Sequence, residues 1–204
     1  MAKTLVLWLG GVICRTPGDA VIHSAAKIGG PPAPDRRVRI RDLTRELTLG
    51  RLDGRAFLLA ATAVLDLAAH AHDLEAELLA GETVGEDLAR LLDELVERHR
   101  LCLLCDYPRQ WLERLVEGLG LNRWFSESAR LLLPELGLPA VAPDLYASLP
   151  GRVGSAREDA LLIEPDPRRA ASAVRVDLNT ILYQGPWRLG RELRLRQWLP
   201  WPPS

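Results

Sequence analysis

Several features that mark particular classes of protein are scarce or absent in this sequence. The chain has three cysteines among 204 residues, and no apolar run reaches the roughly 18 residues that cross a lipid bilayer. The formal net charge is −1, so the molecule as a whole has no electrostatic attraction for nucleic acid or an anionic membrane. An odd number of cysteines and an N-terminus without an export-signal pattern predict reduced thiols and a cytoplasmic location. We therefore expect neither nucleic acid nor a membrane among the partners.

The cysteines give no indication of a metal or redox site. Cys102 and Cys105 form a C-x-x-C pattern inside the apolar run LCLLC. Residues three apart on a strand face opposite sides, so the two sulfur atoms should diverge. No second cysteine–histidine pair is present to complete four zinc ligands. Both residues are expected to belong to the core, and we predict no metal and no cofactor.

The stretch 5–13, LVLWLGGVI, is the element around which the chain is organised. A near-continuous apolar run with a Gly-Gly pair is typical of a buried parallel strand that leads into a tight turn. Further strands are predicted at 101–105, 131–133, 160–163 and 180–183. Helices are predicted within 15–30, 38–49, 53–71, 73–80, 86–99, 106–119, 144–149, 167–176 and 186–199.

Residues with preferences at helix ends refine these boundaries. Asp19 and Asp106 each stand where an N-cap residue is expected, the latter with Pro108 in the first turn of its helix. The stretch PPAP at 31–34 predicts a stiff linker and a hinge between subdomains. The sequence thus predicts side-chain caps on two helices and one hinge.

Alternating strands and helices predict an α/β fold. We expect a Rossmann-like parallel sheet of about five strands covered by helices, with a helical cap inserted after the first strand. Residues 1–14 and 86–204 would form the α/β core, and residues 15–85, which contain no predicted strand, would form the cap.

LVLWLGGVI resembles the first motif of the haloacid dehalogenase-like (HAD) phosphohydrolases. The opening strand of that family typically reads hydrophobic-hydrophobic-Phe-Asp-Leu-Gly-Gly-Val. In this match Gly10 lies on a glycine of the motif, whereas Trp8 lies on the aspartate nucleophile. An indole can neither attack phosphorus nor bind Mg²⁺, because its only polar atom is a hydrogen-bond donor. The stretch 43–60 also resembles the helical cap of small HAD phosphatases.

The remaining three motifs of the family are matched in order but not in chemistry. In the second, LCLLCDYP places Cys105 on the family's Ser or Thr, with Asp106 next to it. In the third, AVAPDLYASL places Ala142 on the lysine that neutralises phosphate and nucleophile. In the fourth, ALLIEPDP places Glu164 on the first metal-binding acid and Pro165 on the second. The resemblance therefore implies a HAD fold without catalytic residues and without a metal site.

Three acids near these motifs leave one alternative open. Asp106, Glu164 and Asp166 follow predicted strands whose carboxyl ends should meet at one edge of the sheet. Such a residual acidic cluster would offer oxygen ligands to a weakly bound divalent metal. It could also serve a paired-carboxylate hydrolase, which needs one carboxyl protonated and the other ionised.

The C-terminal segment is rich in tryptophan and arginine. Trp187, Trp198 and Trp201 lie within its last 20 residues, and these residue types dominate protein–protein interfaces. One interpretation is that Trp198 and Trp201 present an apolar surface to a partner or to another copy of the chain. The alternative is that Trp187 and Trp198 seal the last helix onto the sheet, with Trp201 folded back over it.

Two functions follow from these patterns. The first is a catalytically inactive HAD-like protein, a pseudophosphatase with a binding, regulatory or scaffold role and a protein partner or homo-oligomer. The second is a HAD-family hydrolase that acts on a phosphorylated small molecule with rebuilt active-site chemistry. HAD chemistry needs a carboxylate nucleophile and a metal that offsets repulsion between two anions, so the four substitutions favour the first.

Overall fold

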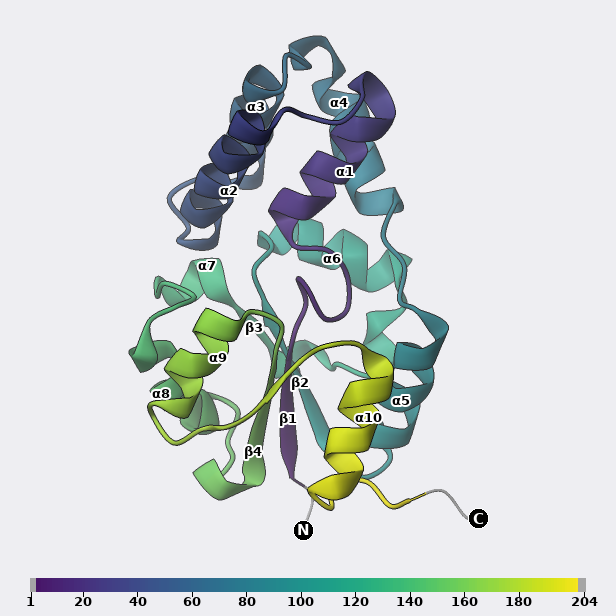
Figure 1. Cartoon of the computed structure of the whole chain (residues 1–204), viewed down its shortest axis with the longest axis vertical. Helices are drawn as coiled ribbons and strands as arrows, with labels where there is room; N and C mark the ends of the chain where they lie inside the picture. Colours follow the sequence, from purple (N-terminus) through teal and green to yellow (C-terminus); the bar gives the residue numbers. More distant parts are fainter. Residues whose placement is uncertain (1–2, 202–204) are drawn as a thin grey trace.

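A parallel sheet of five strands forms the centre of the molecule, as the computed structural model shows for residues 3–201 (Figure 1). The strand order is β3-β2-β1-β4-β5, and every pair is parallel. The strands are β1 (Thr4–Trp8), β2 (Arg100–Cys105), β3 (Arg130–Leu132), β4 (Ala160–Glu164) and β5 (Asn179–Leu182). The predicted Rossmann-like α/β fold is confirmed.

The two central strands are buried along their whole length. Every residue of β1 and β4 is buried, which is why both read as continuous apolar runs in the sequence. Leu7 of β1 pairs with Leu103 of β2 and with Ile163 of β4. The end of β1 is therefore flanked on both sides by the ends of its neighbours, and ligands of open α/β folds bind at this edge.

Helices cover both faces of the sheet. α5 and α10 pack against each other on one side, and α8 and α9 pack against each other on the other side (Figure 1). The helices of this part are α5 (Glu86–Val96), α6 (Arg109–Gly118), α7 (Leu133–Leu136), α8 (Pro143–Arg152), α9 (Pro167–Val174) and α10 (Pro186–Leu195). None of the helices in the described part of the chain combines the length and apolar composition that crossing a membrane requires.

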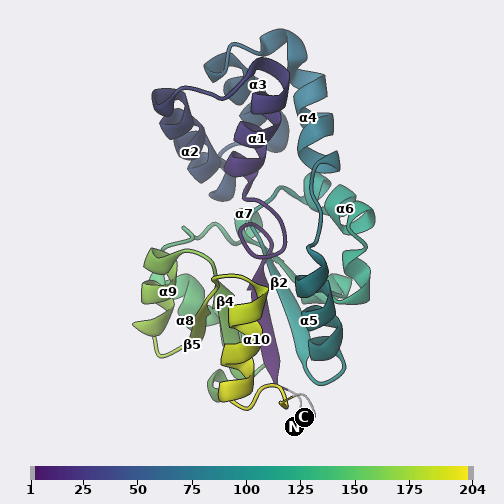
Figure 2. The same ribbon diagram turned by 45° about the vertical axis from the view of Figure 1, so that its right-hand side comes forward.

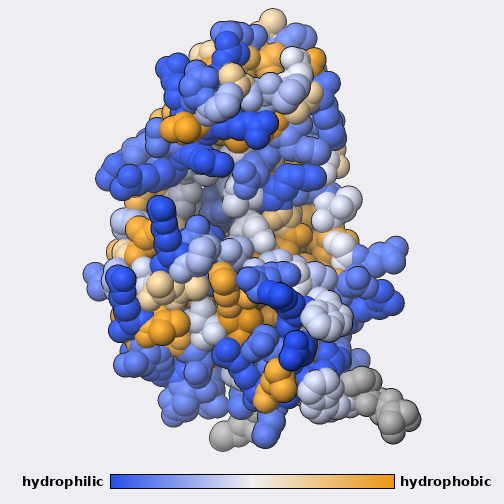
Figure 3. Space-filling model, viewed as in Figure 1, coloured by the Kyte–Doolittle hydropathy of each residue, from blue (hydrophilic) through white to orange (hydrophobic). Residues whose placement is uncertain are grey.

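Four further helices form a separate block beyond the carboxyl ends of the strands (Figure 2). They are α1 (Pro17–Gly29), α2 (Pro34–Thr48), α3 (Gly54–Val64) and α4 (Ala71–Ala80). α1 packs on α4 and α2 packs on α3, around a small core that includes Ile40, Leu47 and Phe57. Hydrophilic side chains dominate the visible surface of this block, whereas patches of hydrophobic side chains appear over the part of the chain that contains the sheet (Figure 3).

The chain passes between the two parts at 14–16 and at 81–85, and hydrogen bonds connect these two segments to each other. The carboxylate of Glu82 accepts hydrogen bonds from the Arg15 backbone N–H at 2.9 Å and from its guanidinium at 3.0 Å. The linker at 31–33 instead joins α1 to α2 inside the helical block. The prediction of a subdomain hinge at PPAP is therefore wrong.

The two predicted N-caps are also wrong. α1 is capped by Thr16, whose hydroxyl oxygen accepts from the Asp19 N–H at 3.2 Å, so Asp19 lies inside the first turn. α6 begins at Arg109 after Pro108, and no side chain caps it. Asp106 lies too far from this helix start and binds elsewhere, as described below.

Two predicted helices end at least four residues earlier than expected. α3 stops at Val64 instead of 71, because Asp66 adopts a left-handed conformation with φ 57° that breaks the helix. α10 stops at Leu195 instead of 199, where Gln197 has φ 60° and the Trp198 N–H donates to the Leu193 carbonyl at 2.8 Å. Both ends follow the left-handed termination that is common at helix C-termini.

Candidate functional site

The carboxyl edge of the sheet brings three of the motif positions together. Trp8 ends β1, Cys105 ends β2 and Glu164 ends β4. Because Leu7 pairs with Ile163, Glu164 lies level with Trp8 on the neighbouring strand. This edge is therefore the place at which the chemistry of a HAD fold would be expected.

Trp8 fills part of this edge. Its side chain is completely buried, and the Arg169 guanidinium from α9 lies 4.0 Å from the centre of its ring. A guanidinium over the face of a tryptophan is an attractive cation–π contact. The Trp8 indole N–H has no hydrogen-bond acceptor within the described residues. Trp8 thus gives this edge a buried aromatic surface on which a cation lies.

Glu164 is buried and fully engaged by its own protein. Its carboxylate accepts from Arg169 Nε at 2.8 Å and from the Asp166 N–H at 2.9 Å, and the Tyr146 hydroxyl oxygen lies 3.3 Å from it. Burial raises the pKa of Glu164 to about 7, although the Arg169 guanidinium acts in the opposite direction. The carboxylate that the family uses for a metal therefore forms an internal ion pair here.

Asp106 turns back toward the loop after β1. Its Oδ1 accepts the Gly10 N–H at 3.1 Å, and burial raises the pKa of this carboxyl to about 6. A Cβ atom at position 10 would lie 2.5 Å from Asp106 Oδ2, so only glycine allows this contact. This bond explains why Asp106 does not cap α6.

The three acids of the possible residual cluster each accept hydrogen bonds from donors of their own chain. Asp166 caps α9, where its Oδ1 accepts from the N–H groups of Arg168 at 2.8 Å and Arg169 at 3.0 Å. Within residues 3–201, no group of three His, Cys, Asp or Glu side chains is placed to hold a metal ion. Each acid is directed toward a different set of donors, and a divalent-metal site at Asp106, Glu164 and Asp166 stays a prediction.

The remaining motif positions contribute no reactive group. The Cys105 thiol is buried between the backbone N–H and carbonyl of Tyr107, and burial raises its pKa well above the usual range. Ala142 precedes α8 without a side-chain cap. The ring of Pro165 packs closely on Gly11, where an added Cβ would lie 2.8 Å from its Cγ. None of these atoms can act as a nucleophile at neutral pH.

Arg169 is the site residue that sequence reasoning missed. It lies in the first turn of α9, five residues after Glu164, and it contacts both Trp8 and Glu164. A basic residue close after the fourth motif was the available signal, but arginines on helices usually face solvent. The Tyr146 hydroxyl, which lies beside the same carboxylate, donates to the Ala140 carbonyl at 2.5 Å.

The three tryptophans of the C-terminal segment have different environments. Trp198 is only 7% exposed and packs on the His99 ring at 5.3 Å, with the Lys3 ammonium 4.8 Å from its ring centre. The interpretation that Trp198 presents a surface to a partner is therefore wrong. Trp187 and Trp201 are 73% and 62% exposed, so Trp187 does not seal α10 onto the sheet.

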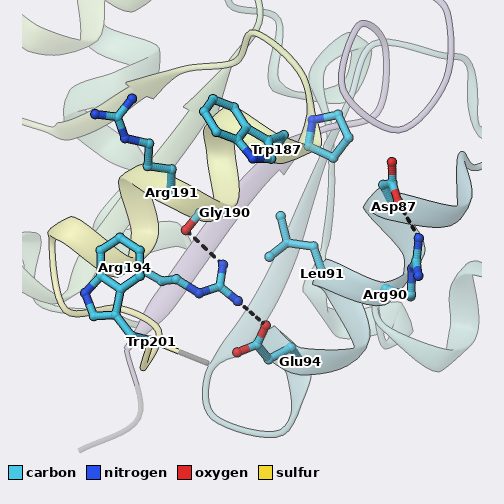
Figure 4. Close-up of a pocket in the computed structure, with 10 residues that line it drawn as sticks. Asp87, Arg90, Leu91, Glu94, Trp187, Gly190, Arg191, Arg194 and Trp201 are labelled. Atoms are coloured by element: carbon cyan, nitrogen blue, oxygen red, sulfur yellow. Dashed lines mark hydrogen bonds and ion pairs between the residues drawn. The ribbon is translucent and has the colours of Figure 1, made fainter. Parts of the chain in front are cut away.

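The exposed tryptophans line a groove between α5 and α10 (Figure 4). Its volume is about 670 Å³, and Leu91 projects from α5 toward Gly190 of α10. Arg194 crosses the groove to bind Glu94 at 2.9 Å and the Gly190 carbonyl at 3.1 Å. This groove is the second candidate site, and it belongs to a different part of the surface from the edge at Trp8.

Solved structures with a similar fold are enzymes. A HAD family enzyme from Bacteroides thetaiotaomicron, in complex with magnesium and inorganic phosphate, matches with a TM-score of 0.71 and 14% identity over 90% of this chain and 95% of that chain. L-2-haloacid dehalogenase from Xanthobacter autotrophicus matches with a TM-score of 0.65 and 20% identity over 95% and 82%. A further dehalogenase matches with a TM-score of 0.69 and 17% identity over 90% and 85%.

The chain therefore has the fold of the haloacid dehalogenase-like superfamily, and the resemblance inferred from its motifs is confirmed at this level. No protein-family model matches the sequence, and no curated protein matches it. At identities of 14% to 20%, the likeness extends to the fold and not to the activity of these enzymes.

Proposed function

We propose that this chain is a catalytically inactive HAD-like protein whose role is to bind a protein partner. In this proposal residues 15–85 are a cap and the rest of the chain is the core. The observation that carries it is the internal unit of Trp8, Glu164 and Arg169 at the carboxyl edge. One ion pair with a 2.8 Å contact and one cation–π contact occupy the positions at which nucleophile and metal would be needed.

The chemistry of the edge supports this proposal. Covalent phosphoryl transfer needs a carboxylate on the first strand, and an indole has no lone pair to offer there. Positive charge for a phosphate would have to come from Arg169, which is already bound to Glu164. A phosphate that bound Arg169 would displace the buried Glu164 carboxylate from its partner, and an unpaired buried charge is costly.

One observation favours the alternative, a hydrolase with rebuilt chemistry. The edge carries two buried carboxyls with raised pKa values, about 6 for Asp106 and about 7 for Glu164. Carboxyls that titrate near neutral pH can serve as general acid and base. Both carboxyls already accept hydrogen bonds from their own chain, and this argues against such a use, because a general base must be free to reach a substrate proton.

A turnover assay separates the two functions. Purified protein is incubated with Mg²⁺ and either p-nitrophenyl phosphate or 2-chloropropionate, and released nitrophenol or chloride is measured. We expect no turnover above that of the Glu164→Gln and Asp106→Asn variants, which preserve shape and remove the two carboxylates. Turnover in the original protein that either substitution abolishes would establish the hydrolase and refute the proposal.

A further inference from the structure

The groove between α5 and α10 combines exposed aromatic surface with positive charge. Trp187 and Trp201 line it, and the buried Leu91 and Gly190 contribute to its lining. Large apolar side chains that gather in one exposed place mark interaction sites more often than single exposed residues do. Tryptophan and arginine are also the residue types most enriched among the residues that dominate binding energy.

The charges of the groove are unbalanced. Asp87 binds Arg90, and Glu94 binds Arg194, so both acids of the groove are already paired. Arg191 contacts no acid among residues 3–201, and its guanidinium lies 6.0 Å from the centre of the Trp187 ring. The charged residues of α10 that line the groove are two arginines, Arg191 and Arg194, and no acid of this helix lines it. The α10 side of the groove is therefore positively charged, and a partner surface that complements it is negatively charged.

The groove continues beyond the aromatic pair. A second hollow of about 630 Å³ shares Arg194 and Trp201 with it and extends past the end of α10 along 195–200. Two hollows that share Arg194 and Trp201 and lie along one helix suit a chain segment better than a compact small molecule. Amphipathic segments commonly lay an apolar face into grooves of this kind.

We propose that this groove binds an acidic amphipathic segment of a partner protein. An apolar side chain of the segment packs against Trp187, Trp201 and Leu91, and one of its carboxylates pairs with Arg191. Pairing of the same groove in two copies is disfavoured, because a twofold axis would place this positive side against itself. The inference rests on the proposed function and names its partner class.

The test uses fluorescein-labelled peptide libraries and the full-length protein. In one library a central Trp, Phe or Leu is flanked by Asp and Glu, and in the matched library the same centre is flanked by Lys. Binding is measured by fluorescence anisotropy at low and at physiological salt. We expect the acidic library to bind at least tenfold more tightly, and the difference to shrink as salt rises.

Variants locate the binding surface. Trp187→Ala and Arg191→Glu should each weaken acidic-peptide binding at least tenfold, and Arg191→Glu should improve binding of the Lys library. Val174→Ala and Arg175→Glu, at exposed positions on the other side of the sheet, are the matched controls and should leave binding unchanged. Because all four side chains are exposed, the variants are expected to fold, which thermal unfolding verifies.

Three outcomes would overturn the inference. Equal binding of both libraries would remove the charge argument, and binding that survives Trp187→Ala would place the peptide elsewhere. Concentration-dependent dimers in sedimentation velocity that Trp187→Ala abolishes would identify a second copy as the occupant. A different result would refute the proposed function: turnover in the assay above that depends on Glu164 or Asp106, whether or not the peptides bind.

Discussion

Replacing Arg169 by methionine tests whether the carboxyl edge is held together by its own ion pair. The Arg169 side chain is 13% exposed and its partner Glu164 is fully buried, so the pair is shielded from water. Removing one member of a buried pair costs about 3–5 kcal/mol, because the other charge stays buried without a partner. We expect a loss of this size at pH 8, a large part of the roughly 5–15 kcal/mol that stabilises a typical domain.

The loss should depend on pH with a defined sign. The pKa of Glu164 is about 7 in the folded protein, raised by burial above its ordinary 4.5, so folding favours the protonated form. Stability associated with this group is present below pH 4.5 and declines as pH rises through 7. Removing Arg169 raises the folded pKa further and extends this decline above pH 7. The penalty of Arg169→Met should therefore be small at pH 5 and largest at pH 8.

Urea unfolding followed by far-UV circular dichroism at pH 5 and pH 8 measures this effect. Arg168→Met is the matched control, because Arg168 is the exposed neighbour of Arg169, and its effect should stay within about 0.5 kcal/mol. The double variant Glu164→Gln/Arg169→Met carries neither charge and should recover most of the loss at pH 8. An equal penalty at both pH values, or a double variant no more stable than Arg169→Met, would refute the ion-pair argument.

Three further predictions address the edge and the groove. Trp8→Asp should lower the free energy of unfolding by roughly 3–5 kcal/mol, because packing is lost and an acid is buried, and it should not create phosphatase turnover. An unchanged melting temperature would show that Trp8 is not buried. Millimolar Mg²⁺ should leave the melting temperature unchanged, and a rise of several degrees that EDTA reverses would contradict the assignment of the acids to internal donors. Acrylamide should quench mainly the fluorescence of the exposed Trp187 and Trp201. Replacing both by phenylalanine should therefore remove most of the readily quenched fluorescence. Retained quenching would show that another indole is exposed.

The fold was predictable because the buried strands leave a direct record in the sequence. Runs such as 101–105 and 160–163 are apolar without alternation, since helices cover both faces of the sheet. The positions of Trp8 and Glu164 at the ends of predicted parallel strands also placed them at one edge of the sheet. The helix caps failed because several polar residues compete locally, and Thr16, three residues before Asp19, provides the cap for α1.

The contacts of the site were not predictable because they join distant parts of the chain. Asp106 binds the Gly10 N–H across 96 positions, and the His99 ring binds the Trp198 carbonyl across 99. A sequence pattern shows that Asp106 follows a strand, but not which donor its carboxylate meets. The role of Arg169 depends on the size of Trp8, since the indole supplies the surface on which the guanidinium lies.

The edge and the groove differ in how far their polar groups are satisfied inside the protein, and this difference bears on function. At the edge, Glu164 and Asp106 each meet donors of the same chain, so a ligand would have to displace existing bonds. In the groove, Arg191 has no acid partner among the described residues and Trp187 is 73% exposed, so a ligand would add contacts without breaking any. Binding free energy comes from the surplus of new over lost interactions. Binding at the groove can therefore gain more free energy than binding at the edge.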